Sequence, residues 1–161
     1  LTLFGLCPKI ALVIYHAKKE LNMAKDVREW SARSILKAMA NPSEKGYEIK
    51  IKNPEITFLG IANQPDYATI FITMYPQDTV VELRSLKLYF QQFRNKIISY
   101  ERLINAIYED LVAVYAPIRL RIVMVLSARG GISSKLTIDS DWAIRGGEEK
   151  FHDWNGQSDE W

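Results

Sequence analysis

The apolar and polar positions along the chain predict four β-strands. Tyr47–Lys52 alternates apolar and charged side chains, which is typical of a strand with one face in water. Asn53-Pro54 is expected to end that strand. Ala68–Tyr75 is β-branched and aromatic on both faces, which predicts a central strand. Two later apolar runs, Ile118–Leu126 and Ile132–Ile138, predict the other two strands.

Apolar residues at helical spacing predict two adjacent helices between these strand pairs. They run from Glu82 to Asn95 and, with Ser99 as the N-cap, from Tyr100 to Tyr115. A further helix is predicted over Met23–Ala40. The order ββααββ indicates an α+β domain with an antiparallel four-stranded sheet, an inserted helix pair and an extra N-terminal helix. The expected boundaries are an extension over 1–46, a domain over 47–145 and a polar tail over 146–161.

Composition narrows the possible partners of the chain. A length of 161 residues fits one domain. The formal charge of +2 is small, so we expect no direct nucleic-acid partner. The first 16 residues are apolar but lack a basic start and are too short for a membrane span, and Cys7 is the single cysteine. We therefore expect a cytoplasmic protein without a membrane partner. Because Met23 begins a more ordinary polar helix, one hypothesis is that residues 1–22 precede the true start.

Familiar catalytic motifs are absent from the sequence. It has no Gly-rich phosphate loop and no metal-type spacing of Cys and His, so no metal is expected. Polar residues instead stand at the ends of the predicted elements, and each alone has an ordinary explanation as a turn residue, a helix-end charge or a hairpin. They are Asp66, Glu82, Ser85, Lys87, Glu101 and Arg129-Gly130-Gly131.

Taken together, these residues resemble one enzyme family. The segments Gln64–Ile70, Val81–Tyr89, Phe93–Asn95 and Arg129–Ile132, together with Glu101, resemble the 7-cyano-7-deazaguanine reductases, the QueF nitrile reductases of queuosine biosynthesis. The resemblance extends over residues 47–138. It implies the tunnelling fold shared with GTP cyclohydrolase I, in which subunits assemble into rings. Active sites at the interfaces of a homo-oligomer are then expected.

The resemblance also implies a mechanism and a role for each matching residue. A cysteine thiolate attacks the nitrile to form a thioimide, and NADPH then delivers two hydrides, leaving an aminomethyl group. Asp66 matches the proton donor, and Glu101 matches the carboxylate that binds the amino and ring N–H groups of the 7-deazaguanine. The implied substrate-binding residues are Val81, Glu82, Leu83, Tyr100 and Glu101. The implied NADPH-binding residues are Leu83, Arg84, Ser85, Lys87, Arg129 and Gly130.

The sequence departs from this family at its nucleophile. Gly60 stands where the family has cysteine, in a loop that is one residue shorter. Tyr100 replaces a family histidine, and a tyrosine is a poor general acid–base group at neutral pH. Leu83 and Arg84 replace a serine and a lysine.

A cysteine in the family's sequence context occurs elsewhere in the chain. Leu6-Cys7-Pro8-Lys9 reproduces the missing tetrapeptide, so Cys7 is a candidate nucleophile that would have to fold back to the pocket. The alternative is a catalytically impaired subunit of the same fold that binds a deazaguanine or a pterin. A third possibility is an amidine-forming relative that uses the same thioimide without NADPH.

Overall fold

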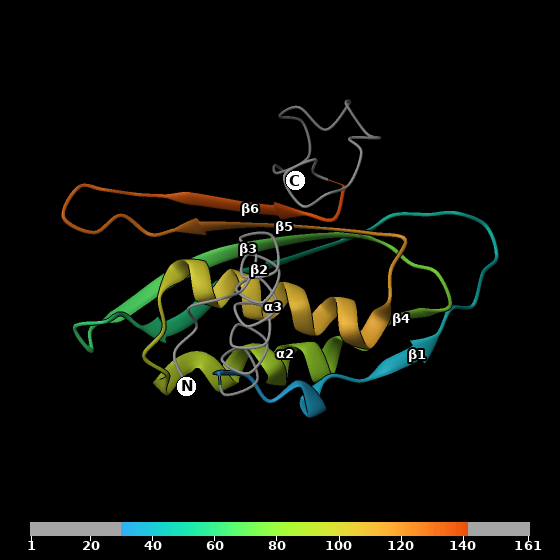
Figure 1. Cartoon of the computed structure of the whole chain (residues 1–161), viewed down its shortest axis with the longest axis horizontal. Coiled ribbons are helices and arrows are strands. Elements are labelled where there is room, and N and C mark those ends of the chain that lie inside the picture. The colour runs from blue at the N-terminus through green and yellow to red at the C-terminus, as the bar shows by residue number, and fades with distance from the viewer. Residues whose placement is uncertain (1–29, 142–161) are drawn as a thin grey trace, which may run out of the picture.

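The computed structural model describes residues 30–141 (Figure 1). The elements in this range are η1 (Arg33–Ile35), β1 (Ala38–Ala40), β2 (Ile49–Leu59), β3 (Pro65–Tyr75), β4 (Thr79–Val81), α2 (Leu83–Gln91), η2 (Gln92–Asn95), α3 (Tyr100–Tyr115), β5 (Arg119–Leu126) and β6 (Lys135–Asp139). Apart from the short strands β1 and β4, this order is the predicted ββααββ order, so the α+β prediction is confirmed.

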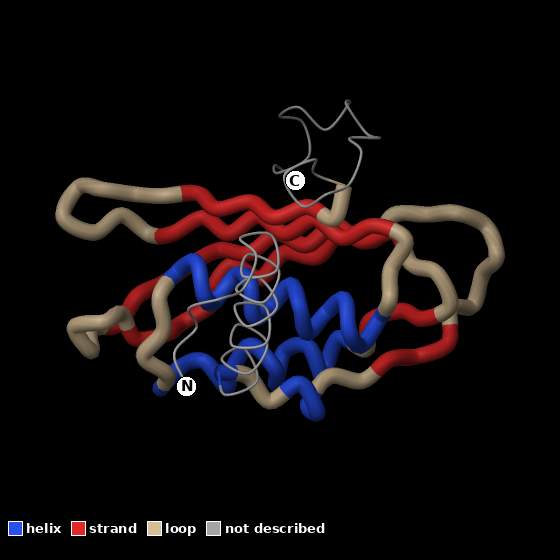
Figure 2. Tube along the Cα trace, in the orientation of Figure 1, coloured by secondary structure: helices blue, strands red, loops and turns tan. Residues whose placement is uncertain are grey.

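The main sheet has the order β2-β3-β5-β6, and every neighbouring pair is antiparallel. Strand β3 is therefore central, as its apolar character predicts. Helices α2 and α3 cover one face of this sheet (Figures 1 and 2). The layers place the core between sheet and helices, where alternate side chains of β3 and β5 meet the apolar faces of the helices.

The core is built from the residues that share the inward parity of each strand. Fully buried side chains from β3 include Ile70, Ile72 and Met74, and α3 contributes Leu103, Ile107 and Leu111. Burying a Leu, Ile or Met side chain contributes about 1.5–3 kcal/mol, so these six residues are a large part of the driving force for folding. They fix the register of β3 against α3 and thereby the positions of the polar residues at the ends of these elements.

Strand β2 continues through Asn53-Pro54, where the sequence predicts its end. The register against β3 shifts between Asn53 and Ile56, which marks a β-bulge. Proline is tolerated there because β2 is an edge strand, so its missing N–H removes no ladder bond on the inner side. The prediction of a break is wrong, and the strand extends to Leu59, close to the candidate site.

The predicted helix over Met23–Ala40 is wrong in its C-terminal part. Ala38–Ala40 forms β1, which pairs with β4 so that Met39 lies opposite Val80. The backbone N–H of Glu82 also donates to the carbonyl of Lys37 at 3.2 Å. Pairing with the β4 edge outweighs the helix propensity of this segment. Residues 23–29, like Cys7 and the tail, lie outside the described residues.

A buried carboxylate ties the segment before β1 to the helices. Asp110 is 1% exposed and accepts hydrogen bonds from Ser31 Oγ, from Tyr89 OH at 2.8 Å and from Arg33 Nε at 2.7 Å. Burial raises the pKa of Tyr89 well above its usual value, with the charge of Asp110 as the second cause. Three donors compensate the cost of burying the Asp110 carboxylate.

The last strand of the described range starts later than the sequence predicts. Strand β6 begins at Lys135 rather than at Ile132, and the residues between β5 and β6 form a longer hairpin loop. Within residues 30–141 no helix is long and apolar enough to cross a membrane.

Candidate active site

Asp66 lies within β3 rather than in the loop before it. It pairs with Phe58 of β2, and it has the same inward parity as Ala68 and Ile70. The residue is only 7% exposed. A carboxylate at the inward-facing end of a central strand must be hydrogen-bonded to offset its desolvation.

Two side chains from distant segments supply those hydrogen bonds. Arg129 Nη1 lies 2.9 Å from Asp66 Oδ1 and 3.1 Å from Oδ2. The hydroxyl of Tyr100 donates to Asp66 Oδ2 at 3.1 Å. Burial, followed by the hydrogen bond to Asp66, raises the pKa of Tyr100 above its usual value of 10.0. Tyr100 is therefore a hydrogen-bond donor over the whole neutral range.

The first turn of α3 is held against the end of β2. The N–H of Leu59 donates to the carbonyl of Lys96 and the N–H of Ile98 donates to the carbonyl of Leu59, both at 2.9 Å. Ser99 then caps the helix by accepting from the N–H of Arg102 at 3.4 Å. The Tyr100 ring meets Phe58 edge-on, with 5.7 Å between the ring centroids. These contacts fix the position of Tyr100 relative to Asp66.

A glycine-dependent turn places Arg129. Gly130 and Gly131 both have positive φ, at 58° and 81°, a combination typical of the tight turn of a hairpin. Arg129 and Ile132 exchange backbone hydrogen bonds of 2.9 and 3.1 Å across this turn. The turn holds Arg129 at a fixed point of the β5–β6 loop, so that its guanidinium reaches Asp66.

These residues line a cavity of about 360 Å³. Its walls are residues 60–62 of the β2–β3 turn, residues 98–101 at the start of α3, and the side chains of Asp66 and Arg129. Glu101 lines this cavity, and among residues 30–141 its carboxylate has no hydrogen bond or ion pair. An acid and a free carboxylate thus border one space of a size that holds a small ligand.

Gly60 lies directly against the carboxylate of Asp66. A Cβ built on Gly60 would collide with Asp66 Oδ2 and would lie 3.2 Å from Arg129 Nη1. The Asp66–Arg129 ion pair therefore occupies the space that a side chain at position 60 would need. A side chain at position 60 fits only if this pair moves.

The other predicted site residues lie at the opposite end of the subunit. Thr79 of β4 donates to the carbonyl of Tyr115 at 2.8 Å, whereas Asp66 contacts Tyr100, the first residue of the same helix. Because α3 has 16 residues, its two ends are about 24 Å apart. Val81, Glu82 and the start of α2 follow Thr79 directly, and in Figure 1 β4 lies at the far end of the molecule from the β2–β3 turn.

Glu82 is the N-cap of α2. Its carboxylate accepts from the N–H of Arg84 at 2.8 Å and from the N–H of Ser85 at 2.7 Å. These two backbone hydrogen bonds lower the pKa of Glu82 below its usual value. Ser85 is buried, and its hydroxyl donates to the carbonyl of Glu82 and accepts from the N–H of Lys37. Leu83 is exposed, and its side chain is free for a ligand or a second subunit.

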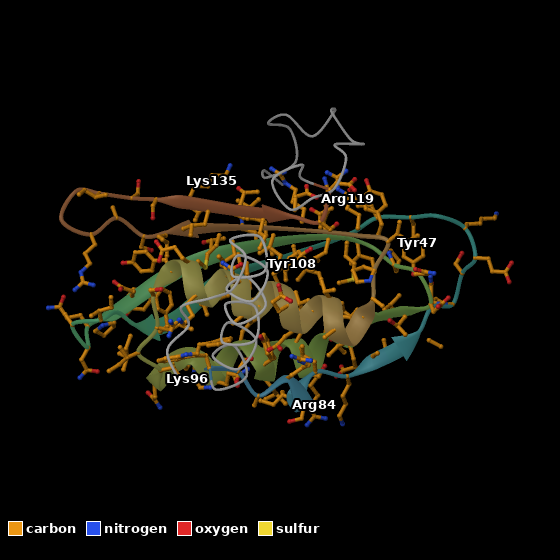
Figure 3. The ribbon with its side chains drawn as sticks, viewed as in Figure 1. Tyr47, Arg84, Lys96, Tyr108, Arg119 and Lys135 are labelled. Carbon is orange, nitrogen blue, oxygen red and sulfur yellow. The ribbon has the colours of Figure 1, made fainter. Side chains whose placement is uncertain are left out.

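Two predicted cofactor-binding cations lie on the outer side of α2. Arg84 and Lys87 are exposed, and within the described range neither side chain forms a hydrogen bond or a salt bridge, although, besides the backbone hydrogen bonds, the charge of Arg84 contributes to lowering the pKa of Glu82. Figure 3 shows Arg84 and Lys96 toward opposite ends of the α2–η2 segment. Lys87 also borders a second cavity of about 200 Å³ beside the β2 bulge, together with Arg94. Arg94 belongs to the segment Phe93–Asn95 that carries the resemblance, but no role was predicted for it.

The structure thus separates the predicted site into two groups. Asp66, Tyr100, Glu101 and Arg129 come together, with Gly130 in the adjoining turn. Val81, Glu82, Leu83, Arg84 and Ser85 form the other group, and Lys87 lies one turn further along α2. Sequence reasoning missed the cavity-lining residues Ile61 and Ile98 and the direct pairing of Arg129 with Asp66.

Comparison with known proteins identifies the family. A family model described as "QueF-like protein" matches residues 65–143. An NADPH-dependent 7-cyano-7-deazaguanine reductase of Nitratiruptor sp. is 36% identical over 118 residues, which cover 73% of this chain and 90% of the relative. The chain belongs to this reductase family. The reductase of Chlorobium luteolum is 42% identical over 96 residues, which cover 59% of this chain and 83% of the relative.

A solved structure supports the fold assignment. The archaeosine synthase QueF-Like in its apo form aligns with a TM-score of 0.50 at 16% identity, covering 61% of this chain and 95% of that protein. At this identity the likeness concerns the fold alone. The resemblance to the reductase family and the tunnelling fold are both confirmed.

Proposed function

We propose that this chain catalyses the NADPH-dependent reduction of the nitrile of 7-cyano-7-deazaguanine to an aminomethyl group, in queuosine biosynthesis and hence tRNA modification, in the cytoplasm. Curated relatives at 36–42% identity carry this activity in their names. The observation that carries the proposal is the cavity that brings Asp66 and Glu101 together. Nitrile reduction needs both an acid near the nitrogen and a group that holds the base.

Glu101 is proposed to hold the deazaguanine. Glu101 lines the cavity, and among residues 30–141 its carboxylate has no hydrogen bond or ion pair, so it can accept from the amino and ring N–H groups of a guanine-like edge. Such charge-assisted hydrogen bonds select for the base, because a ligand without those donors would leave the carboxylate desolvated and unpaired. The cavity of about 360 Å³ lies in the usual range for small-molecule sites.

Asp66 is proposed to protonate the nitrogen as the carbon–nitrogen triple bond is reduced. Asp66 lines the cavity, and the Tyr100 hydroxyl fixes one of its carboxylate oxygens. A thiolate adding to the nitrile carbon places negative charge on nitrogen, and a positioned acid accelerates that step by about 10²–10⁴-fold.

Cys7 is the proposed nucleophile, because Gly60 has no side chain and the sequence holds one cysteine. The described chain begins at Trp30, whose carbonyl accepts from Lys96 Nζ at 2.7 Å and whose ring lies 5.2 Å from the Arg102 guanidinium. Lys96 and Arg102 lie near the start of α3, so Trp30 is at the cavity end of the domain. An extended chain covers about 3.3 Å per residue, so the 22 residues between Cys7 and Trp30 can reach the cavity of this or an adjacent subunit.

NADPH supplies the hydrides in this reaction. Glu82 already occupies the backbone N–H groups at the start of α2, so the phosphates must be held by side chains. Arg84 and Lys87 are exposed cations on this helix and fit that task, with Leu83 exposed beside them. The Ser85 hydroxyl is hydrogen-bonded to the backbone of Lys37 and Glu82, so it stabilises the start of α2 rather than binding the cofactor directly.

A homo-oligomer is proposed to complete the site. The Glu82 group and the Asp66 group lie at opposite ends of one subunit, so a pocket that uses both must be shared between neighbouring chains. Strands β2 and β6 are the two edges of the main sheet, and their free backbone groups can pair with a neighbour.

The covalent step provides the test. The protein is incubated with 7-cyano-7-deazaguanine, its intact mass is measured, and NADPH is then added and its oxidation followed. We expect a mass increase equal to the ligand, its absence in Cys7→Ala, and NADPH oxidation in the wild type alone. Binding without adduct or turnover would support the impaired binding subunit instead, an adduct that NADPH does not discharge would support the amidine-forming relative, and absence of binding would contradict all three.

A further inference from the structure

The ion pair between Asp66 and Arg129 is the feature that the assigned roles leave unexplained. The family resemblance implies that Arg129 binds NADPH, yet the Nη1 atom of Arg129 lies within 3.1 Å of both carboxylate oxygens of Asp66. Asp66 is buried, whereas the Arg129 side chain is 42% exposed. The guanidinium thus reaches inward from a solvent-facing turn to a buried acid, at the wall of the cavity.

Gly60 provides the space that this pair occupies. A Cβ at position 60 would meet the nearer Asp66 oxygen at less than contact distance and would also crowd Arg129. Gly60 does not have a positive φ, so its backbone conformation is one that other residues adopt. Within the described range, positive φ occurs at Asn63, Ala116, Gly130 and Gly131. The missing side chain, not backbone freedom, is what the site requires of glycine here.

We propose that Arg129 is a positioning residue for the acid Asp66, and that Gly60 makes this contact possible. The proposal rests on the proposed function, in which Asp66 gives a proton to the substrate nitrogen. When the O–H bond of the Asp66 carboxylic acid breaks, its proton goes to nitrogen and a carboxylate remains. Arg129 keeps its own protons throughout and receives that carboxylate in the ion pair of the structure.

The two candidate roles of Arg129 predict different kinetics. If Arg129 positions Asp66, Arg129→Gln should lower kcat about tenfold, part of the contribution of a general acid, and leave KM for NADPH within about twofold. Arg129→Lys should restore part of kcat, because an ammonium group can still pair with a carboxylate. A raised KM for NADPH with unchanged kcat would assign Arg129 to the cofactor and overturn the proposal.

Two melting experiments test the geometry without any substrate. Gly60→Ala should lower Tm in the wild type and lower it less in an Asp66→Ala background, where the colliding oxygen is gone. Arg129→Gln should likewise lower Tm less when Asp66 is replaced by Asn. Equal losses in both backgrounds would overturn the contact.

The kinetic and melting experiments test the two proposals independently. A wild type that binds no deazaguanine and oxidises no NADPH would overturn the proposed function and with it the acid role of Asp66. The melting cycles would still decide whether Arg129 holds Asp66 over Gly60. Additive melting losses with normal turnover would keep the proposed function and remove the positioning role.

Discussion

We propose that Glu101, which lines the candidate cavity, is the main determinant of base binding there. In the complex of Glu101→Ala with a deazaguanine, the amino and ring N–H groups of the ligand would have no carboxylate partner. We therefore expect the affinity for 7-cyano-7-deazaguanine to fall by roughly 2–5 kcal/mol, the usual cost of removing one partner of a buried charged pair. Isothermal titration calorimetry measures this loss. Glu44→Ala, in an exposed loop outside that cavity, is the matched control.

An unchanged affinity in Glu101→Ala would mean that Glu101 acts only as a charge at the positive end of α3. That result would move base recognition to another carboxylate.

The hydroxyl of Tyr100 is expected to support Asp66 without titrating itself. Burial and the hydrogen bond to Asp66 raise the pKa of Tyr100, so it stays protonated between about pH 6 and 9. Tyr100→Phe should lower kcat about two- to tenfold, the worth of one hydrogen bond, by the same factor at every pH in that range. Steady-state kinetics across pH measures the ratio. A ratio that changes with pH would show Tyr100 gaining or losing a proton during catalysis.

At the residue scale, the sequence carried more information on Asp66 than on Arg129. Asp66 stands two and four residues before Ala68 and Ile70, so strand periodicity alone places it on the buried face. The pairing with Arg129 joins positions 63 residues apart through a hairpin loop, and no local pattern encodes that distance. The collision at Gly60 is a three-body packing effect and needs coordinates.

The stability of helix α2 is expected to depend on pH through its cap. Glu82 has a folded-state pKa below its usual value of 4.5, because its carboxylate accepts from backbone N–H groups of the first turn. Its contribution to stability is therefore fully present above pH 4.5 and is lost as pH falls through the lowered value. Glu82→Gln should lower Tm at neutral pH, and the difference from the wild type should shrink as the pH falls below 4.5.

Thermal melts at several pH values measure this effect. Glu55→Gln removes an exposed carboxylate of β2 that caps no helix, so its difference from the wild type should be small at every pH. A Glu82→Gln difference that does not decrease in acid would mean that the cap contributes no pH-dependent stability.

At the element scale, the sequence predicted the helices and strands that bury an apolar face, but it missed features of the edge strands β1 and β2. Apolar periodicity located α3, β5 and the combined α2–η2 segment within one or two residues, because burial fixes those patterns. The segment Ala38–Ala40 has helical propensity but pairs with β4. Pro54 reads as a stop, yet an edge strand with a bulge accepts it. In both cases a long-range backbone contact outweighed the local preference.

At the scale of the whole molecule, the two groups of predicted site residues lie at opposite ends of one subunit. The sequence places Asp66 and Glu82 only 16 positions apart, whereas the fold places them at opposite ends of α3. A long strand followed by a turn toward the helix layer produces this separation, since β3 of 11 residues extends about 36 Å. Sequence proximity therefore misleads here, and shared function of the two groups requires a second copy of the chain.

Mixing two inactive variants tests this arrangement. If each pocket takes Asp66 from one subunit and the Glu82 group from its neighbour, homo-oligomers of Asp66→Asn and of Glu82→Gln are both inactive. Co-expressed at equal levels, they should regain about a quarter of the wild-type rate, because a random ring pairs two intact half-sites at one interface in four. Separately purified oligomers mixed without subunit exchange should stay inactive, which is the control. An active Glu82→Gln homo-oligomer would leave Glu82 with its capping role alone, and no recovery in verified mixed oligomers would contradict a pocket shared between subunits.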